Sequence, residues 1–181
     1  MTNFNPADVD VFLASFAAEG GTSENLAAIA QQPALSRYLI GRVNPVLVDC
    51  SGRPNIPAGC TYDEAEQPEN LFRGLVDLTK IDVQLCPTQI DKGVVGGEAM
   101  LLEHAVILSS HVIDRIEADP TLFQDSWEGK YVICGSVFRR SGGDRVVRCV
   151  YRHGGRVYVN LYWLSDDFYR LYPMAVPRVS P

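Results

Sequence analysis

The fold is decided by residues 130–164, KYVICGSVFRRSGGDRVVRCVYRHGGRVYVNLYWL. Three runs in this stretch are rich in the β-branched and aromatic residues that favour strands: Tyr131–Arg140, Arg145–His153 and Arg156–Leu164. Ser141–Asp144 and the pair Gly154-Gly155 separate the runs, and glycine supplies the positive φ angles that hairpin turns require. The stretch therefore predicts three antiparallel strands joined by two tight turns.

The two turns also predict how the strands are paired. If Gly154-Gly155 is a two-residue loop, His153 lies opposite Arg156, and Cys149 lies opposite Asn160. A turn at Gly142-Gly143 places Phe138 opposite Val147 and Val137 opposite Arg148. Opposite residues share a face. The first face then carries Val132, Cys134, Ser136, Phe138, Val147, Cys149, Tyr151, Tyr158, Asn160 and Tyr162. The second carries Ile133, Gly135, Val137, Val150, Val157, Val159, Leu161 and Trp163, together with Arg139, Arg148 and Arg152.

Neither face alternates cleanly between apolar and polar residues, so we expect both to be at least partly covered. The small side chains of Cys134, Ser136 and Cys149 would let a helix approach the first face closely. We therefore assign the helix to that face and leave the second open to another subunit, another layer or a ligand. The reverse assignment stays open, because the second face is the more aliphatic one.

The covering element is predicted to be one long helix, Glu98–Glu117. Its apolar residues recur at helical spacing and form a wide stripe, which is typical of a largely buried helix. They are Leu101, Ala105, Leu108, Val112 and Ile116, with Leu102, Val106 and Ile113 beside them. Asp119-Pro120 ends the helix.

The remaining chain predicts shorter elements. Helices are expected from Asn5-Pro6 to Gly20, from Thr22 or Ser23 to Gln31, over Ala34–Ile40, over Glu69–Leu78 and from Ser165 to Leu171. Val46–Asp49 and Ile81–Leu85 are expected to be strands, and Cys50–Gln67 is the longest irregular stretch.

This order of elements predicts one α+β domain spanning residues 1–181, with a curved antiparallel sheet packed on the long helix. The sheet consists of the meander and one or two earlier strands. Two architectures resemble this outline, the cystatin/NTF2-like roll and the hot-dog fold. The leading N-terminal helices favour the first, and the pair Gly96-Gly97 before the long helix favours the second. We favour the cystatin/NTF2-like roll.

Composition limits the classes of function. With 46% hydrophobic and 21% charged residues, the chain resembles an ordinary globular protein, and no apolar run reaches the ~20 residues of a membrane span. The N-terminus lacks the features of a signal peptide, and five cysteines without CxxC spacing indicate reduced thiols, so we expect a cytoplasmic protein. A net charge of −6 argues against nucleic-acid binding. We find no cofactor or metal motif, so we expect no cofactor and no metal ion. We likewise expect neither nucleic acid nor a membrane as a partner.

The charge is unevenly distributed. Residues 130–164 carry a net charge of +6, so the remainder carries −12. The basic residues are Lys130, Arg139, Arg140, Arg145, Arg148, Arg152 and Arg156. One interpretation is that the arginines are solvated or pair with the acidic remainder of the fold. The other is an anion site on the sheet.

Three functional hypotheses follow from these patterns, and the sequence leaves open whether the protein is an enzyme. The leading hypothesis is a pocket for a small organic molecule between sheet and helix, lined by Phe138, Tyr151, Tyr158, Asn160 and Tyr162, with Arg148 as a further ligand-binding candidate.

The second hypothesis is an enzyme acting on an acyl or carbonyl substrate. Its base would be Glu98, Glu103 or a His111–Asp114 pair, and the amides of Gly96-Gly97 would stabilise an oxyanion. The third hypothesis is a homodimeric interaction protein. Its interface would use either the Arg148, Val159, Leu161 and Trp163 face or the arc of the helix that carries Met100 and Ile107.

Overall fold

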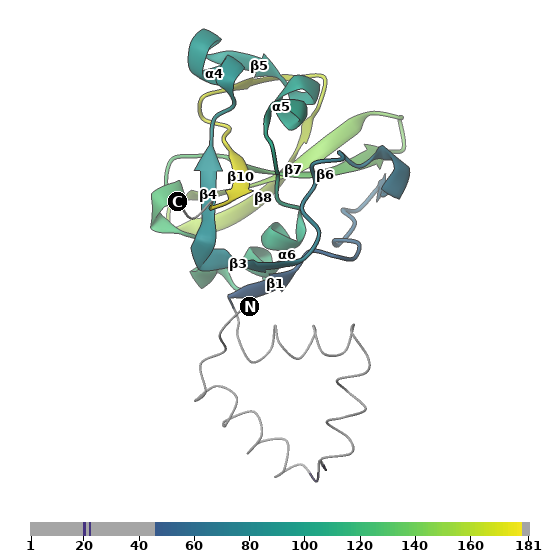
Figure 1. Ribbon diagram of the computed structural model, residues 1–181, viewed down its shortest axis with the longest axis vertical. Helices are drawn as coiled ribbons and strands as arrows, with labels where there is room; N and C mark the ends of the chain where they lie inside the picture. The colour runs from purple at the N-terminus through teal and green to yellow at the C-terminus, as the bar shows by residue number, and fades with distance from the viewer. Residues whose placement is uncertain (1–19, 21, 23–45, 179–181) are drawn as a thin grey trace.

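The computed structural model describes Gly20, Thr22 and residues 46–178 (Figure 1). The helices predicted between Asn5 and Ile40 lie outside the described residues, apart from Gly20 and Thr22. The described chain is an α+β structure with few helices and a mostly antiparallel sheet.

The central sheet has six strands. Along its main path the order is β4 (Ile81–Gln84), β10 (Met174–Pro177), β6 (Val132–Arg140), β7 (Arg145–His153) and β8 (Arg156–Trp163), and β2 (Cys60–Thr61) pairs with the far end of β6. Only β10 and β6 run parallel. Two smaller sheets pair β1 (Leu47–Asp49) with β3 (Leu75–Asp77), and β5 (Val94–Gly96) with β9 (Asp167–Tyr169).

The described helices are short. They are α4 (Pro87–Lys92), α5 (Gly97–Glu103), α6 (His111–Ala118) and the 3-10 turns Glu64–Glu66, Leu78–Lys80, Pro120–Leu122 and Asp125–Trp127. Figure 1 shows α4, α5 and β5 at one end of the sheet, and α6, β1 and β3 at the other. Within the described ranges, every helix is too short or too polar to cross a membrane.

The predicted meander is confirmed, and the pairing of its second hairpin is correct at each residue. His153 pairs with Arg156, Cys149 with Asn160 and Val147 with Tyr162. Gly154 and Gly155 have φ angles of 56° and 77°, as a two-residue turn of this hand requires. A two-residue loop allows only one pairing of the strands it joins, so the sequence alone could predict how β7 pairs with β8.

The predicted register of the first hairpin is wrong by one residue. Phe138 pairs with Val146 instead of Val147, and a bulge between Cys134 and Val137 shifts the pairing again, so that Cys134 lies opposite Arg148. A slip of one residue moves a whole strand to the other face. Cys134 and Phe138 therefore share the face of Arg148 and Leu161, not the face of Cys149 and Tyr162.

The predicted long helix is also wrong. It divides into α5 and α6, and residues 104–110 between them form an irregular segment that crosses the sheet. Leu108 donates its N–H to the carbonyl of Ala175 and accepts from the N–H of Gly135 in the β6 bulge. A Cβ atom at Gly135 would lie 2.2 Å from Cδ1 of Ile107, so only glycine allows this approach. The β-branched pair Val106-Ile107, followed by Ser109-Ser110, is the local signal for the break.

The sheet is covered on both sides, as expected, but not by the predicted element. Helix α6 packs on the face of Arg148, where Ile113 and Ile116 contact Val132 and Val150 in one core cluster. The opposite face is covered by α5 and β9. Its core cluster includes Met100, Phe168, Ile133, Val147 and Met174. Helix α6, the second half of the predicted helix, thus lies on the face that we had left open, and α5, the first half, lies on the opposite face.

Two predicted short helices are absent from their positions. Glu69–Leu78 contains strand β3, and Ser165–Leu171 contains strand β9, in which buried Phe168 lies between exposed neighbours. That alternation has the period of a strand. The strands predicted at Val46–Asp49 and Ile81–Leu85 are confirmed as β1 and β4. Because α5 and α6 are separate, neither the cystatin/NTF2-like roll nor the hot-dog outline is confirmed.

Candidate functional site

The predicted ligand-binding residues fall on two faces of the sheet. Tyr151, Tyr158, Asn160 and Tyr162 share one face of the β7–β8 hairpin. Phe138 lies on the other face, in a cluster with Tyr62 and Val146, and so does Arg148. The structure therefore brings four of the six residues together.

The tyrosine side of this set forms a packed aromatic surface. The ring of Tyr151 stacks on Tyr158 at a centroid distance of 5.5 Å and contacts Tyr131 at 4.6 Å. The side-chain amide of Asn160 donates to the hydroxyl of Tyr151 at 3.3 Å. Tyr172 extends the cluster to Tyr162. Burial raises the pKa of Tyr162. These rings contact one another, so they resemble a packed layer more than the lining of an open pocket.

The candidate acids and the glycine pair of the enzyme hypothesis are held by separate partners. Glu98 accepts from Arg145 at 2.7 Å, and Glu103 accepts from the N–H of Thr88 at 2.9 Å. The Thr88 hydrogen bonds lower the pKa of Glu103. The N–H of Gly97 donates to the carbonyl of Asp166, so it is not directed at a substrate.

His111 and Asp114 lie on the same short helix, but they form hydrogen bonds with different partners. Nδ1 of His111 contacts Oγ of Ser109 at 2.7 Å. The carboxylate of Asp114 accepts from Arg148 and from the N–H of Asn55. Burial lowers the pKa of His111, although the negative charge of Asp114 opposes this effect. The general-base hypothesis stays a prediction, and the described residues do not gather its members at one cavity.

Two buried cysteines have raised pKa values, and the described residues contain no metal-binding cluster. Burial raises the pKa of Cys50 to about 11 and that of Cys149 to about 12, so both remain protonated near neutral pH. No group of three His, Cys, Asp or Glu residues within the described ranges could hold a metal ion.

Arg148 is the most deeply buried charge on the sheet. Its side chain is 5% exposed and forms ion pairs with Asp114 and Glu117, both on α6. Arg139, Arg145 and Arg152 also pair with acids, namely with Glu66, Glu98 and Asp125 respectively. For these four arginines, pairing with the acidic remainder of the fold is the interpretation that the structure supports.

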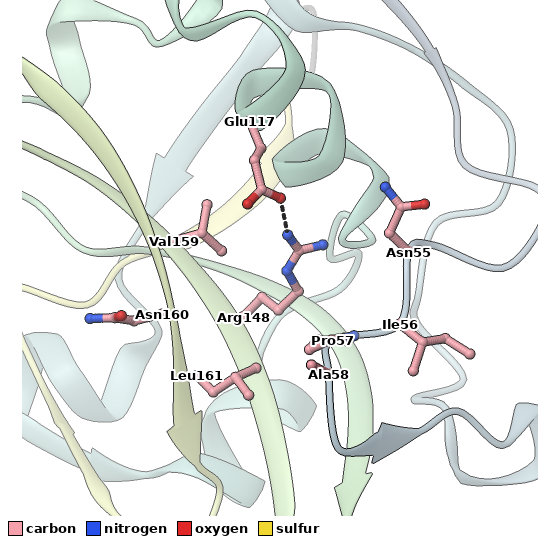
Figure 2. Close-up of a pocket in the computed structure, with 9 residues that line it drawn as sticks. All are labelled: Asn55, Ile56, Pro57, Ala58, Glu117, Arg148, Val159, Asn160 and Leu161. Atoms are coloured by element: carbon pink, nitrogen blue, oxygen red, sulfur yellow. Dashed lines mark hydrogen bonds and ion pairs between the residues drawn. The ribbon is translucent and has the colours of Figure 1, made fainter.

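A groove of about 460 Å³ lies beside Arg148. Figure 2 shows Arg148 reaching from β7 toward Glu117, with loop 55–58 as one wall and the side chains of Val159 and Leu161 on β8 at the other side. The side chain of Asn160 points away from the groove. Because both carboxylates neutralise Arg148, the groove carries no free positive charge for an anion. Its lining combines apolar side chains, among them Val159 and Leu161, with the polar groups of Asn55, Glu117 and Arg148, and it is open beside β8.

Strand β8 is the last strand of the sheet along its main path, and no described strand pairs with its outer side. In a two-residue hairpin the residues beside the loop exchange both hydrogen bonds, so Arg156 and every second residue after it bond to β7. The bond from the N–H of Leu164 to Arg145 continues this pattern. Val157, Val159 and Leu161 therefore direct their N–H and C=O groups outward.

The outer edge of β8 lacks the protections that sheet edges commonly have. It is eight residues long, it contains no proline, and its one charged residue is Arg156 at the start. Tyr158 is 41% and Trp163 39% exposed. The other edge strand, β4, has four residues, and the carboxylate of Asp82 accepts the N–H of Val83. An edge that is long, largely apolar and charged only at its first residue is a template for pairing with another strand.

Comparisons with models of protein families, with curated proteins and with solved structures found no match. The function of the chain therefore has to be inferred from the arrangement of the described residues. The sequence predicted an interface on the face of Arg148, Val159 and Leu161, but not the free edge of β8 or the position of loop 55–58 that makes this face a groove. Loop 55–58 carries no local signal for its position against Arg148, and a strand becomes an edge only through the order of the whole sheet. The hairpin position of β8, followed by β9 outside the sheet, was the only available signal.

Proposed function

We propose that this chain is an interaction protein that binds another polypeptide in extended conformation along the free edge of β8. One observation carries the proposal: the terminal strand of the sheet directs the backbone groups of Val157, Val159 and Leu161 outward, and no described strand pairs with them. Addition of a strand to such an edge is a recurrent mode of peptide recognition.

Backbone hydrogen bonds would supply affinity that depends little on the sequence of the bound strand. Side chains supply selectivity, because alternate residues of an added strand face opposite sides of the sheet. On one side they would meet Tyr158 and Tyr162. On the other they would meet Val159 and Leu161 at the mouth of the groove. Both sides favour an apolar or aromatic partner strand.

The small-molecule hypothesis has less geometric support. Its tyrosines pack on one another, and Phe138 and Arg148 lie across the sheet from them. Of its six residues, Arg148 and Asn160 line the groove. The groove is open beside the edge, as expected for a surface that accepts side chains of a bound strand.

The test uses peptides selected from a random-peptide display library against the full chain. We expect the selected peptides to slow amide hydrogen exchange at Val157, Val159 and Leu161. They should bind Val159→Pro at least about tenfold more weakly, because proline removes an outward N–H and its hydrogen bond. Binding is measured by calorimetry.

The matched control is Val159→Thr, which keeps the β-branched shape and the N–H. Its affinity for the selected peptides should stay close to that of the unmodified chain. Peptides that bind Val159→Pro with undiminished affinity, or that protect other segments, would contradict the proposal. So would a selection that yields no peptide dependent on this edge.

A further inference from the structure

We propose that the strand accepted by β8 is β8 of a second copy of this chain, so that two molecules form a two-fold symmetric dimer with a continuous sheet. This inference depends on the proposed function, because it names the partner for the same edge. Three features of β8 carry it: a self-complementary register, opposite charges at its two ends, and exposed aromatic side chains that the pairing would cover.

The register places Asn160 of both copies on the two-fold axis. Val159 then lies opposite Leu161 of the second copy, and these outward-facing residues form the hydrogen-bonded pairs. Val157 lies opposite Trp163 of the second copy, and Tyr158 lies opposite Tyr162. All residues from Arg156 to Leu164 have a partner in this register. Moving the axis to Val159 would instead set Trp163 opposite Gly155 in the hairpin turn, so that the pair of Val157 and Trp163 is lost.

Charge selects the antiparallel arrangement. Exposed Arg156 begins β8, and exposed Asp166 and Asp167 follow its end. In an antiparallel pair, the basic start of one strand meets the acidic end of the other, and symmetry repeats this contact at both ends. A parallel pair would bring Arg156 close to Arg156 of the second copy. Opposite charges across an interface select its register and orientation.

The proposed dimer would also bury exposed apolar side chains of β8. Cross-strand pairs of aromatic and β-branched side chains stabilise sheets, and the proposed register forms one such pair from Val157 and Trp163 and an aromatic pair from Tyr158 and Tyr162. Tyr158 and Trp163 are among the large exposed hydrophobic side chains of the described chain. Leu161 and Val159 of the second copy would also lie beside the mouth of the groove. The dimer therefore covers both faces of the edge at once.

The experiment is sedimentation equilibrium of the full chain over a range of concentrations. We expect a monomer–dimer equilibrium that Val159→Pro weakens and Val159→Thr preserves. The charge contact is tested by Arg156→Glu and by the double variant Asp166→Arg/Asp167→Arg. Each should dimerise about tenfold more weakly than the unmodified chain, because each reversal acts at both ends of the interface.

Mixing these two variants gives the sharpest readout. One then has acidic groups at both ends of β8 and the other has basic groups, so their mixture should form heterodimers while neither forms homodimers well. Lys92→Glu, an exposed charge reversal on α4, is the control and should leave the equilibrium unchanged. Circular dichroism confirms that each variant is folded.

The outcomes separate this inference from the proposed function. A chain that stays monomeric, or a dimer that none of the β8 variants weakens, overturns pairing with a second copy. If display peptides still require the edge in that case, strand binding by β8 stands and its partner is another protein. If they do not, both proposals fail.

Discussion

At the scale of single residues, Arg148 shows how a charge can occupy the middle of a sheet. It lies on β7 between Cys134 and Leu161, where an unpaired guanidinium would be costly. Two acids on α6 reach it, and Asp114 also accepts the N–H of Asn55. Asp114 on α6 therefore connects Arg148 of the sheet to Asn55 in the loop that forms one wall of the groove.

Removing that charge should destabilise the fold strongly. We expect Arg148→Ala to lower the free energy of unfolding by roughly 3 kcal/mol, because Asp114 would remain as an unpaired carboxylate that is largely buried. Asp114→Asn should cost more than Glu117→Gln, because the side chain of Glu117 is 57% exposed. Urea denaturation measures all three. Equal effects of the two acid variants would show that burial does not govern this cluster.

At the scale of elements, the comparison of the two hairpins shows what local sequence can predict. The β7–β8 register follows from Gly154-Gly155, because a two-residue loop is a local constraint. The β6–β7 register fails for two reasons. Its loop has three residues, because Arg140 lies opposite Asp144, and the bulge near Gly135, which approaches Ile107 from a distant part of the sequence, then shifts the pairing again. The same contact divides the long apolar segment into α5 and α6. Its periodicity predicted one buried helix, but Leu102 is 76% and Val106 39% exposed, so both the burial of these residues and the single helix were wrong.

The contact between Gly135 and Ile107 can be tested directly. Gly135→Ala should lower the free energy of unfolding by about 1–3 kcal/mol, because the added methyl group overlaps Cδ1 of Ile107. Ile107→Val in the same chain should recover part of that loss, because it removes Cδ1, the nearer of the two carbons that overlap the added methyl group, and keeps Cγ1. The two variants and their combination form a double-mutant cycle, measured by urea denaturation. Additive losses would mean that the bulge does not depend on this contact.

At the scale of the whole molecule, the folded chain buries one imidazole, that of His104, and half-buries a second, that of His111. His104 is 8% exposed, and its Nε2 is buried without a hydrogen-bond partner among the described residues. Burial lowers its pKa, and burial also lowers the pKa of His111. The negative charge of Glu103 acts to raise the pKa of His104 but does not reverse the shift. The negative charges of Asp114 and Asp49 act in the same way on His111, whereas the positive charge of Arg73 lowers its pKa further.

The stability of the molecule should therefore fall as the pH is lowered from neutrality. Below a pH of about 6.5 the unfolded chain takes up protons on both histidines while the folded chain does not, so the unfolded state binds more protons and is favoured. Asp77, Glu103 and Asp119 have lowered pKa values, so their contribution is lost at still lower pH, below about 4.

Urea denaturation at pH 7.5 and 5.5, at one protein concentration, measures this effect; the concentration is fixed because self-association would also change stability. The double variant His104→Gln/His111→Asn should lose much of the difference between the two pH values, because neither replacement titrates in this range. His153→Gln, at the exposed turn beside Gly154, is the matched control for removing an imidazole. If the double variant kept the full difference, the pH dependence would have another source, and the burial of these two side chains would not be what links the fold to pH.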